Sequence, residues 1–234
     1  MLVNLSRAVL GSQHALIGLL LLVGLSLTWG EPVTAASPSK NLLTANCDPC
    51  TFEIAQKLAP YQIRFRFRNL PDDRRVIQAL EVFTNDKPGW TQSLAVHDMT
   101  PVKRDDKVVI GTADINFDGY NDLLFATSRG IANSYADYWL FAPSTQEFKY
   151  LGNYPIFALD SRNHRLSTYE RGGHAGMIYQ SKHYRFIDGV LTLVESETQE
   201  ATEQDGVYLK RISRLKNGHL RQVKRELIKV PPLD

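Results

Sequence analysis

After residue 60 the chain alternates apolar and polar residues in the manner of β-strands. The clearest case is residues 63–68, where Ile and Phe alternate with three arginines. Such alternation predicts a half-buried strand whose arginines share the solvent face. Three further apolar stretches have the length of strands: 76–84, 108–110 and 123–127.

Three pairs of segments then have the pattern of β-hairpins. They are 135–142 with 147–151, 183–187 with 190–195, and 206–215 with 219–227. The second pair turns at Asp188-Gly189 and the third at Asn217-Gly218, residue types that adopt positive φ at low cost. No stretch after residue 60 has the pattern of a long amphipathic helix. The sequence therefore predicts an all-β fold of antiparallel hairpins in a propeller-like or sandwich arrangement.

The first 36 residues have the pattern of a secretory signal peptide. Arg7 is the only Lys or Arg before an apolar stretch over 15–29, and small residues follow up to Ala36. The alternative is an uncleaved anchor, but the uninterrupted apolar run is shorter than the roughly 20 residues that span a membrane. We therefore expect cleavage near Ala35 or Ala36. The mature protein would be periplasmic or secreted, with no membrane contact after cleavage.

We expect the rest of the chain to divide into a lead at 37–60, a β-domain at 61–230 and a tail at 231–234. The lead contains Cys47-Asp48-Pro49-Cys50. In an oxidising compartment this spacing favours a local disulfide between Cys47 and Cys50. A redox-active pair is the alternative, because a helix starting at such a motif lowers the thiol pKa. A zinc site would need two further ligands.

The overall charge excludes a strong attraction to polyanions. Lys and Arg number 27 against 25 Asp and Glu, a formal net charge of +2, so we expect no nucleic-acid partner. An acidic run is interpreted as a solvated or flexible loop. Its members are Glu195, Glu197, Glu200, Glu203 and Asp205.

One stretch, 114–122, has the spacing of a calcium-binding loop. Ca²⁺ takes six to eight oxygen ligands, which a tight loop supplies from alternate positions. The candidate ligands at positions 1, 3, 5, 7 and 9 are Asp114, Asn116, Asp118, the backbone carbonyl of Tyr120, and Asp122. Gly119 at position 6 permits the sharp turn. The alternative is an Asp-rich solvated turn.

The twelfth position distinguishes this loop from an EF-hand. An EF-hand has an acidic ligand there, whereas this chain has Phe125. Strands rather than helices are also predicted on both sides. We therefore expect an EF-like calcium loop between strands, with a dissociation constant on the order of 10⁻⁴–10⁻³ M, whose role is to pin the two strands together.

The motif Asp-x-Asn-x-Asp-Gly-Tyr-x-Asp-Leu, followed by Tyr138-Trp139-Leu140-Phe141 and Phe148, resembles a family of exported bacterial proteins. These carry a single FG-GAP/integrin-like calcium loop in a propeller-like β-domain. Some members are immunity proteins against lysozyme-like effectors of contact-dependent secretion systems, and they are similar to periplasmic lysozyme inhibitors. The resemblance covers roughly residues 75–225.

The lysozyme inhibitors of this resemblance carry Ser-Gly-x-x-Tyr on the loop that enters the lysozyme cleft. Here Ala175 stands in place of the serine, Gly176 and Tyr179 match, and His174 precedes them. The resemblance therefore implies a partner-binding loop at these four residues. The alternative from the residues alone is a Gly-rich turn before a strand, with Tyr179 packed.

Catalysis needs a nucleophile with a base, or two poised carboxylates. No motif of that kind occurs, and the histidines after residue 36 are scattered along the chain, so we do not expect an enzyme. We expect an exported calcium-binding β-domain that recognises a partner protein, as an inhibitor or immunity protein against a lysozyme-like cell-wall hydrolase. The alternative is a carbohydrate-binding accessory domain or enzyme of the cell envelope with a structural calcium.

Overall fold

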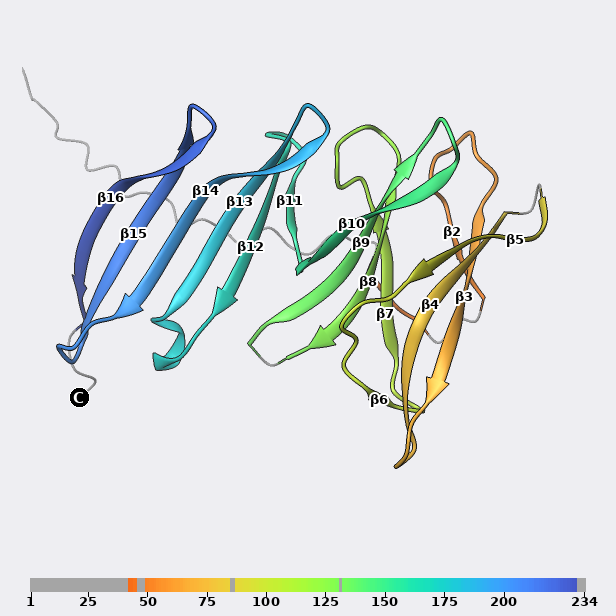
Figure 1. Cartoon of the computed structure of the whole chain (residues 1–234), viewed down its shortest axis with the longest axis horizontal. Coiled ribbons are helices and arrows are strands. Elements are labelled where there is room, and N and C mark those ends of the chain that lie inside the picture. The colour runs from red at the N-terminus through yellow and green to blue at the C-terminus, as the bar shows by residue number, and fades with distance from the viewer. Residues whose placement is uncertain (1–41, 46–48, 85–86, 131, 231–234) are drawn as a thin grey trace, which may run out of the picture. The chain divides into compact units, whose positions relative to one another are not determined.

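The computed structural model describes residues 42–45, 49–84, 87–130 and 132–230 (Figure 1). The chain divides into two units, Met1–Ala35 and Ala36–Asp234. The signal peptide predicted at 1–36 and the tail predicted at 231–234 lie outside the described residues. Within them every element is a β-strand except for one short 3-10 helix, η1 (His174–Gly176). The all-β prediction is confirmed, and no helix here is long and apolar enough to cross a membrane.

The first sheet carries the strand with the alternating arginines. Its order is β2-β3-β4-β5, with β6 paired to β4. Its strands are β2 (Cys50–Phe52), β3 (Tyr61–Asn69), β4 (Arg74–Thr84), β5 (Lys87–Ala95) and β6 (Val102–Lys103). Ile63 and Phe65 of β3 are buried and Arg64 and Arg66 are exposed, which confirms the predicted alternation.

The second sheet has the order β1-β7-β8-β9-β10. Its strands are β1 (Leu42–Ala45), β7 (Val108–Ala113), β8 (Asp122–Arg129), β9 (Ser134–Ala142) and β10 (Glu147–Pro155). The predicted hairpin over 135–151 is β9–β10, with a bulge between Tyr150 and Gly152. The stretch 114–121 connects β7 to β8, so the candidate calcium loop lies between two antiparallel neighbours.

The third sheet has six strands in sequence order, β11 to β16. They are β11 (Ala158–Asp160), β12 (Arg165–Arg171), β13 (Tyr179–Ile187), β14 (Val190–Ala201), β15 (Val207–Lys216) and β16 (His219–Lys229). Both predicted turns have positive φ at their two central residues: 50° and 76° at Asp188 and Gly189, and 51° and 78° at Asn217 and Gly218.

Two apolar clusters hold the sheets together. The first combines buried side chains of the first and second sheets, among them Ile63, Leu80, Phe125 and Trp139. The second combines side chains of the second and third sheets, among them Tyr138, Phe157, Leu166 and Tyr184. Every strand pairing among the described residues is antiparallel, and each of the three sheets has an open strand order.

The lead predicted at 37–60 contributes to both of the first two sheets. β1 pairs with β7 over Leu42–Ala45, and β2 pairs with β3 over Cys50–Phe52. Cys50 is buried in the first apolar cluster and forms a disulfide. Cys47 lies outside the described residues, so its predicted pairing with Cys50 stays a prediction. A lead that supplies strands to two sheets is part of the β-domain's core.

Candidate calcium loop and partner-binding loop

The loop from β7 to β8 folds around the side chains at its first, third and fifth positions. The two carboxylate oxygens of Asp114 accept the backbone N–H groups of Asp118 (3.0 Å) and Gly119 (2.9 Å). The amide of Asn116 donates to Oδ2 of Asp118 (2.8 Å), and Oδ1 of Asp118 accepts the N–H of Tyr120 (2.9 Å). Gly119 has φ +90°, a conformation that residues with a Cβ rarely adopt. The three polar side chains thus converge inside one turn.

The chemistry of this donor set fits a hard cation. Asp114, Asn116 and Asp118 supply side-chain oxygens, and oxygens are the ligands that Ca²⁺ takes. Asp114 and Asn116 are half-buried and Asp118 is exposed. Among the described residues no group of three or more His, Cys, Asp or Glu side chains is arranged to hold a metal ion.

Asp122, the fifth candidate ligand, lies at the base of the loop and is 0% exposed. Its Oδ2 accepts the N–H groups of Ile115 (2.8 Å) and Asn116 (3.3 Å), and its Oδ1 accepts that of Phe141 on β9 (2.8 Å). Burial raises the pKa of Asp122 to about 7, although these backbone hydrogen bonds act in the opposite direction. The carboxylate therefore ties the start of the loop to the neighbouring strand.

The loop is anchored to both apolar clusters. Ile115 is buried in the second cluster, and the ring of Phe117 packs against the same cluster and stacks on His164 at 5.0 Å. Tyr120 instead packs against the first cluster, with its ring 5.7 Å from that of Phe141. The conformation of this loop therefore affects the packing of both apolar clusters.

The segment after β2 docks on the same loop, which sequence reasoning did not predict. The N–H of Asn121 donates to the carbonyl of Ile54 (2.8 Å), and its side-chain amide donates to that of Glu53 (3.0 Å). A hollow of about 510 Å³ lies between residues 53–58 and 119–121. The only sequence signal for this contact was an Asn between two candidate ligands. Nothing in its spacing indicated that it contacts residues so distant in the chain.

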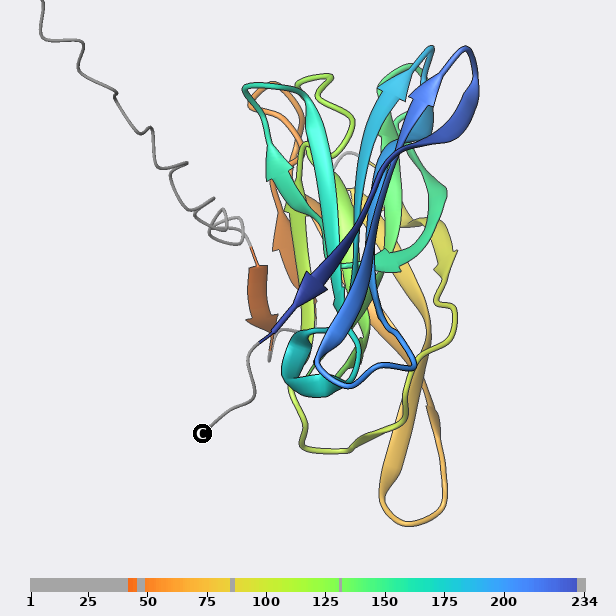
Figure 2. The same cartoon turned by 90° about the vertical axis from the view of Figure 1, so that its left-hand side faces the viewer.

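The predicted partner-binding loop is an exposed turn between β12 and β13 that contains η1. In Figure 2 it lies at the same end of the third sheet as the connection from β14 to β15. Gly172 donates its N–H to the carbonyl of Ile178 (2.7 Å), which closes the loop, and Gln199 donates its side-chain amide to the carbonyl of Met177 (2.7 Å). Ala175 has φ 52°, a left-handed conformation that is uncommon for a residue with a Cβ.

The four predicted loop residues are not all on the loop's exposed face. His174 and Ala175 are exposed, and Gly176 is half-buried. The ring of His174 contacts Tyr208 of β15, with Nδ1 3.3 Å from the hydroxyl. Tyr179 begins β13 and donates its hydroxyl to Glu197 of β14 (2.5 Å). The structure therefore brings His174, Ala175 and Gly176 together in the turn, whereas Tyr179 is held in the sheet.

Tyr179 belongs to a polar cluster on one face of the third sheet. Its ring stacks on the exposed ring of Tyr169 at 5.4 Å, and Glu197 also forms an ion pair with Lys210 at 2.7 Å. Burial raises the pKa of Tyr179, and the hydrogen bond to Glu197 adds to this. A hollow of about 440 Å³ lies beside this cluster and the loop, lined by Ala132, Tyr169, Arg171, Gly172, Ala175 and Gly176.

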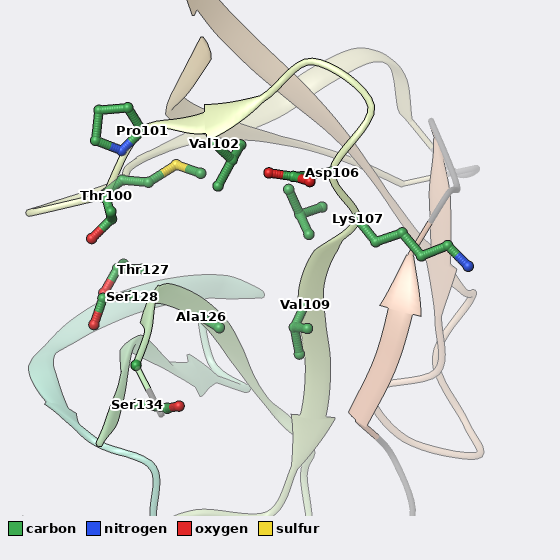
Figure 3. A pocket seen from close by; sticks show the side chains of 13 residues that line it. Thr100, Pro101, Val102, Asp106, Lys107, Val109, Ala126, Thr127, Ser128 and Ser134 are labelled. Atoms are coloured by element: carbon green, nitrogen blue, oxygen red, sulfur yellow. The ribbon is translucent and has the colours of Figure 1, made fainter. Parts of the chain in front are cut away.

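A larger hollow, of about 640 Å³, lies between the segment around β6 and strands β7 to β9 (Figure 3). Three of its polar lining groups form hydrogen bonds within the chain. Thr100 donates its N–H to the carbonyl of Thr127 (2.8 Å), Asp106 accepts the N–H of Lys103 (2.9 Å), and the Thr127 hydroxyl accepts from Asn153 (2.9 Å). The lining residues include no histidine.

A buried carboxylate on β9 forms another polar cluster that the sequence analysis missed. Asp137 is 0% exposed and accepts the N–H of His97 (2.6 Å), the hydroxyl of Tyr150 (3.0 Å) and the amide of Asn153 (2.8 Å). Nδ1 of His97 is 3.5 Å from the same carboxylate. The donors come from two separate stretches, His97 after β5 and Tyr150 and Asn153 of β10, so only the fold brings them together.

These features define the class of the protein. It is an all-β chain with three open antiparallel sheets and an oxygen-lined loop between adjacent strands. Neither a protein-family model nor a curated protein matches the chain. One solved structure, described as that of a Xanthomonas type IV secretion system related protein, is similar with a TM-score of 0.50 and 14% sequence identity. The match covers 79% of this chain and 98% of that chain. At this identity the likeness concerns the fold alone.

Proposed function

We propose that this chain is an exported β-domain protein that binds Ca²⁺ in the 114–122 loop and recognises a partner protein. The observation that carries the proposal is the exposed, hydrogen-bonded turn at 172–178, which presents His174 and Ala175 beside a hollow. The proposed partner is a lysozyme-like cell-wall hydrolase, so that the chain acts as an inhibitor or immunity protein. We also infer a propeller-like arrangement of the three sheets.

The calcium part of the proposal is supported by the donor set of the loop. Asp114, Asn116, Asp118 and the carbonyl of Tyr120 would hold the ion, above the buried carboxylate of Asp122. When bound, the ion would neutralise the clustered carboxylates of the loop. The chain's own contribution is to connect this loop to both apolar clusters through Ile115 and Tyr120.

The partner-binding part is supported by how the turn is held. A recognition loop that is fixed before binding loses less conformational entropy on association. Closure between Gly172 and Ile178 and the bond from Gln199 to Met177 fix the backbone of this loop. Arg171, His174 and Ala175 remain exposed. The signal-peptide pattern of residues 1–36 supports export.

The proposal is tested by cell-wall lysis. The protein, purified as the cell exports it, should slow the lysis of a cell-wall suspension by a lysozyme-like hydrolase encoded beside its gene. Arg171→Glu should weaken this inhibition about tenfold, because it reverses a charge beside the turn. Lys149→Glu is the matched control, since Lys149 is an exposed cation of β10 away from the turn, and it should inhibit like the wild type.

Failure of the wild-type protein to slow any of a panel of such hydrolases would contradict the proposal. Equal inhibition by Arg171→Glu and the wild type would reject the turn as the contact surface.

One observation favours a second candidate function, the binding of cell-envelope carbohydrate. Tyr169 is 50% exposed and its ring stacks on Tyr179 beside the 440 Å³ hollow. Exposed aromatic rings supply flat apolar surface next to polar groups, which suits a sugar ring. Binding of soluble cell-wall glycan that is lost in Tyr169→Ala, without any effect on hydrolases, would favour this function over the first.

A further inference from the structure

The last strand of the third sheet leaves one edge without a neighbour among the described residues. β16 pairs with β15 from His219 to Lys229 and ends the strand order (Figure 1). Residues 219–225 are all exposed, so the strand has no cover on either face there. A free edge of this length presents a row of unpaired N–H and C=O groups to which another strand can add.

The β15–β16 hairpin also concentrates positive charge. Residues 207–229 contain eight Lys or Arg and one Glu. Three of these cations, all on β15, are paired with Glu195, Glu197 and Glu200 of β14. These three residues belong to the acidic run predicted as a solvated or flexible loop, of which Glu203 and Asp205 do lie outside the strand. The ion pairs are Arg214–Glu195 (2.6 Å), Lys210–Glu197 (2.7 Å) and Arg211–Glu200 (2.5 Å). The acidic side chains of β14 are therefore paired with cations of the same sheet.

The remaining positive charge lies along β16 and at the last residue of β15, Lys216. Lys224 forms an ion pair with Glu226 of the same strand at 2.8 Å. No ion pair links any other residue of the described chain to Lys216, Arg221, Arg225 or Lys229. The hairpin thus keeps a local excess of cations although the chain's net charge is only +2.

Apolar side chains lie among these cations on the same strand. Leu220, Val223 and Leu227 are 43%, 39% and 62% exposed. In the register of the hairpin Leu227 lies opposite Leu209, and Leu220 opposite Leu215. Residues opposite one another share a face of the sheet, so this face combines leucines with Arg225 and Lys229.

We propose that the free edge of β16 binds an extended, acidic segment of a partner protein as an added strand. The edge supplies backbone hydrogen bonds, the exposed leucines supply apolar contact, and the unpaired cations select acidic side chains. This interaction surface lies on a different element from the turn at 172–178 and does not depend on the hydrolase proposal.

The charge pattern disfavours two other occupants. A second copy of the chain would place its own cations opposite Arg221, Lys224 and Arg225, and like charges directly opposite destabilise a strand pair. A lipid surface cannot pair the backbone groups of the edge. It would also contact one face only, whereas Lys224 and Arg225, as successive strand residues, point to opposite faces.

The test uses the exported protein and a fluorescent twelve-residue probe peptide of alternating glutamate and valine. Fluorescence anisotropy should show binding that weakens as salt concentration rises, and amide hydrogen exchange should slow in β16. The double variant Arg225→Glu with Lys229→Glu should weaken binding about tenfold or more. The matched control is Arg66→Glu with Arg68→Glu, which reverses two exposed cations of β3 and should bind like the wild type.

Several results would overturn the proposal. They are equal binding of a probe in which glutamine replaces glutamate, equal loss in the β3 control, and protection of amides outside β16. Binding to phosphatidylglycerol vesicles without binding to the peptide would assign the hairpin to a lipid surface instead. A shift to dimers at micromolar concentration without peptide would assign it to self-association.

Discussion

Asp122 is the residue that connects the candidate calcium loop to the sheet. Its two oxygens accept three backbone N–H groups, from Ile115, Asn116 and Phe141, and the side chain is buried. The other acids of the loop, Asp114 and Asp118, hold only N–H groups of the loop itself. The acidic side chains of this one motif therefore differ in burial and in the N–H groups that they bind.

We expect Asp122→Ala to lower the free energy of unfolding by about 3 kcal/mol, because buried N–H groups would lose their acceptor. Urea unfolding in the presence of a chelator measures this without any contribution from a metal ion. Asp118→Ala, at an exposed position, should change the free energy by about 0.5 kcal/mol. An equal loss in both variants would show that Asp122 has no special structural role.

At the scale of elements, the hairpins were the most predictable part of the fold. The residue types at Asp188-Gly189 and Asn217-Gly218 predict the conformation of these turns. The alternation at 63–68 predicts β3 directly. β5 and β12 were missed because neither alternates cleanly. The loop predicted for the acidic run is wrong for Glu195, Glu197 and Glu200, which lie in β14. Their strand position depends on pairing with cations of β15, and single-sequence patterns do not show such pairing.

The β14–β15 pair should make stability depend on pH. Burial acts to raise the pKa of Glu197, but hydrogen bonds from Lys210 and Tyr179 outweigh it and hold the pKa below its ordinary value. A carboxyl with a lowered folded-state pKa stabilises the fold above its unfolded-state pKa, and this stability is lost as pH falls through the folded-state pKa. Glu197→Gln should therefore flatten the decline of the melting temperature in acid.

Thermal melts between pH 7 and pH 2.5 provide the measurement. Glu203→Gln is the control, because Glu203 is exposed in the connection after β14, and it should keep the wild-type profile. If Glu197→Gln and the wild type lost stability in parallel through this range, the cross-strand cluster would not contribute to acid sensitivity.

At the scale of the whole molecule, the loop at 114–122 lies where the two apolar clusters meet. Ile115 belongs to one cluster and Tyr120 packs against the other, and Asn121 holds the segment that follows β2. The sequence predicted from spacing alone that this loop lies between strands, which is confirmed, and its ligand set stays a prediction. It could not predict the contact with residues 53–54, because that contact depends on how the first sheet packs on the second.

The turn at 172–178 shows the same limit at the candidate partner site. The motif located the turn correctly, but the register of β13 and β14 places Tyr179 beside Glu197 and away from the exposed face. Arg171 and Tyr169, which line the hollow beside the turn, precede the motif and had no signal of their own.

The central claim is that calcium in the 114–122 loop stabilises the packing of this fold, and the melting temperature of the exported protein tests it most directly. With millimolar Ca²⁺ the wild type should melt several degrees higher than in chelator, as expected for a ligand that binds only the folded state. Asp114→Ala with Asp118→Ala should melt at one temperature in both conditions. Equal melting temperatures of the wild type with Ca²⁺ and with chelator would contradict the claim.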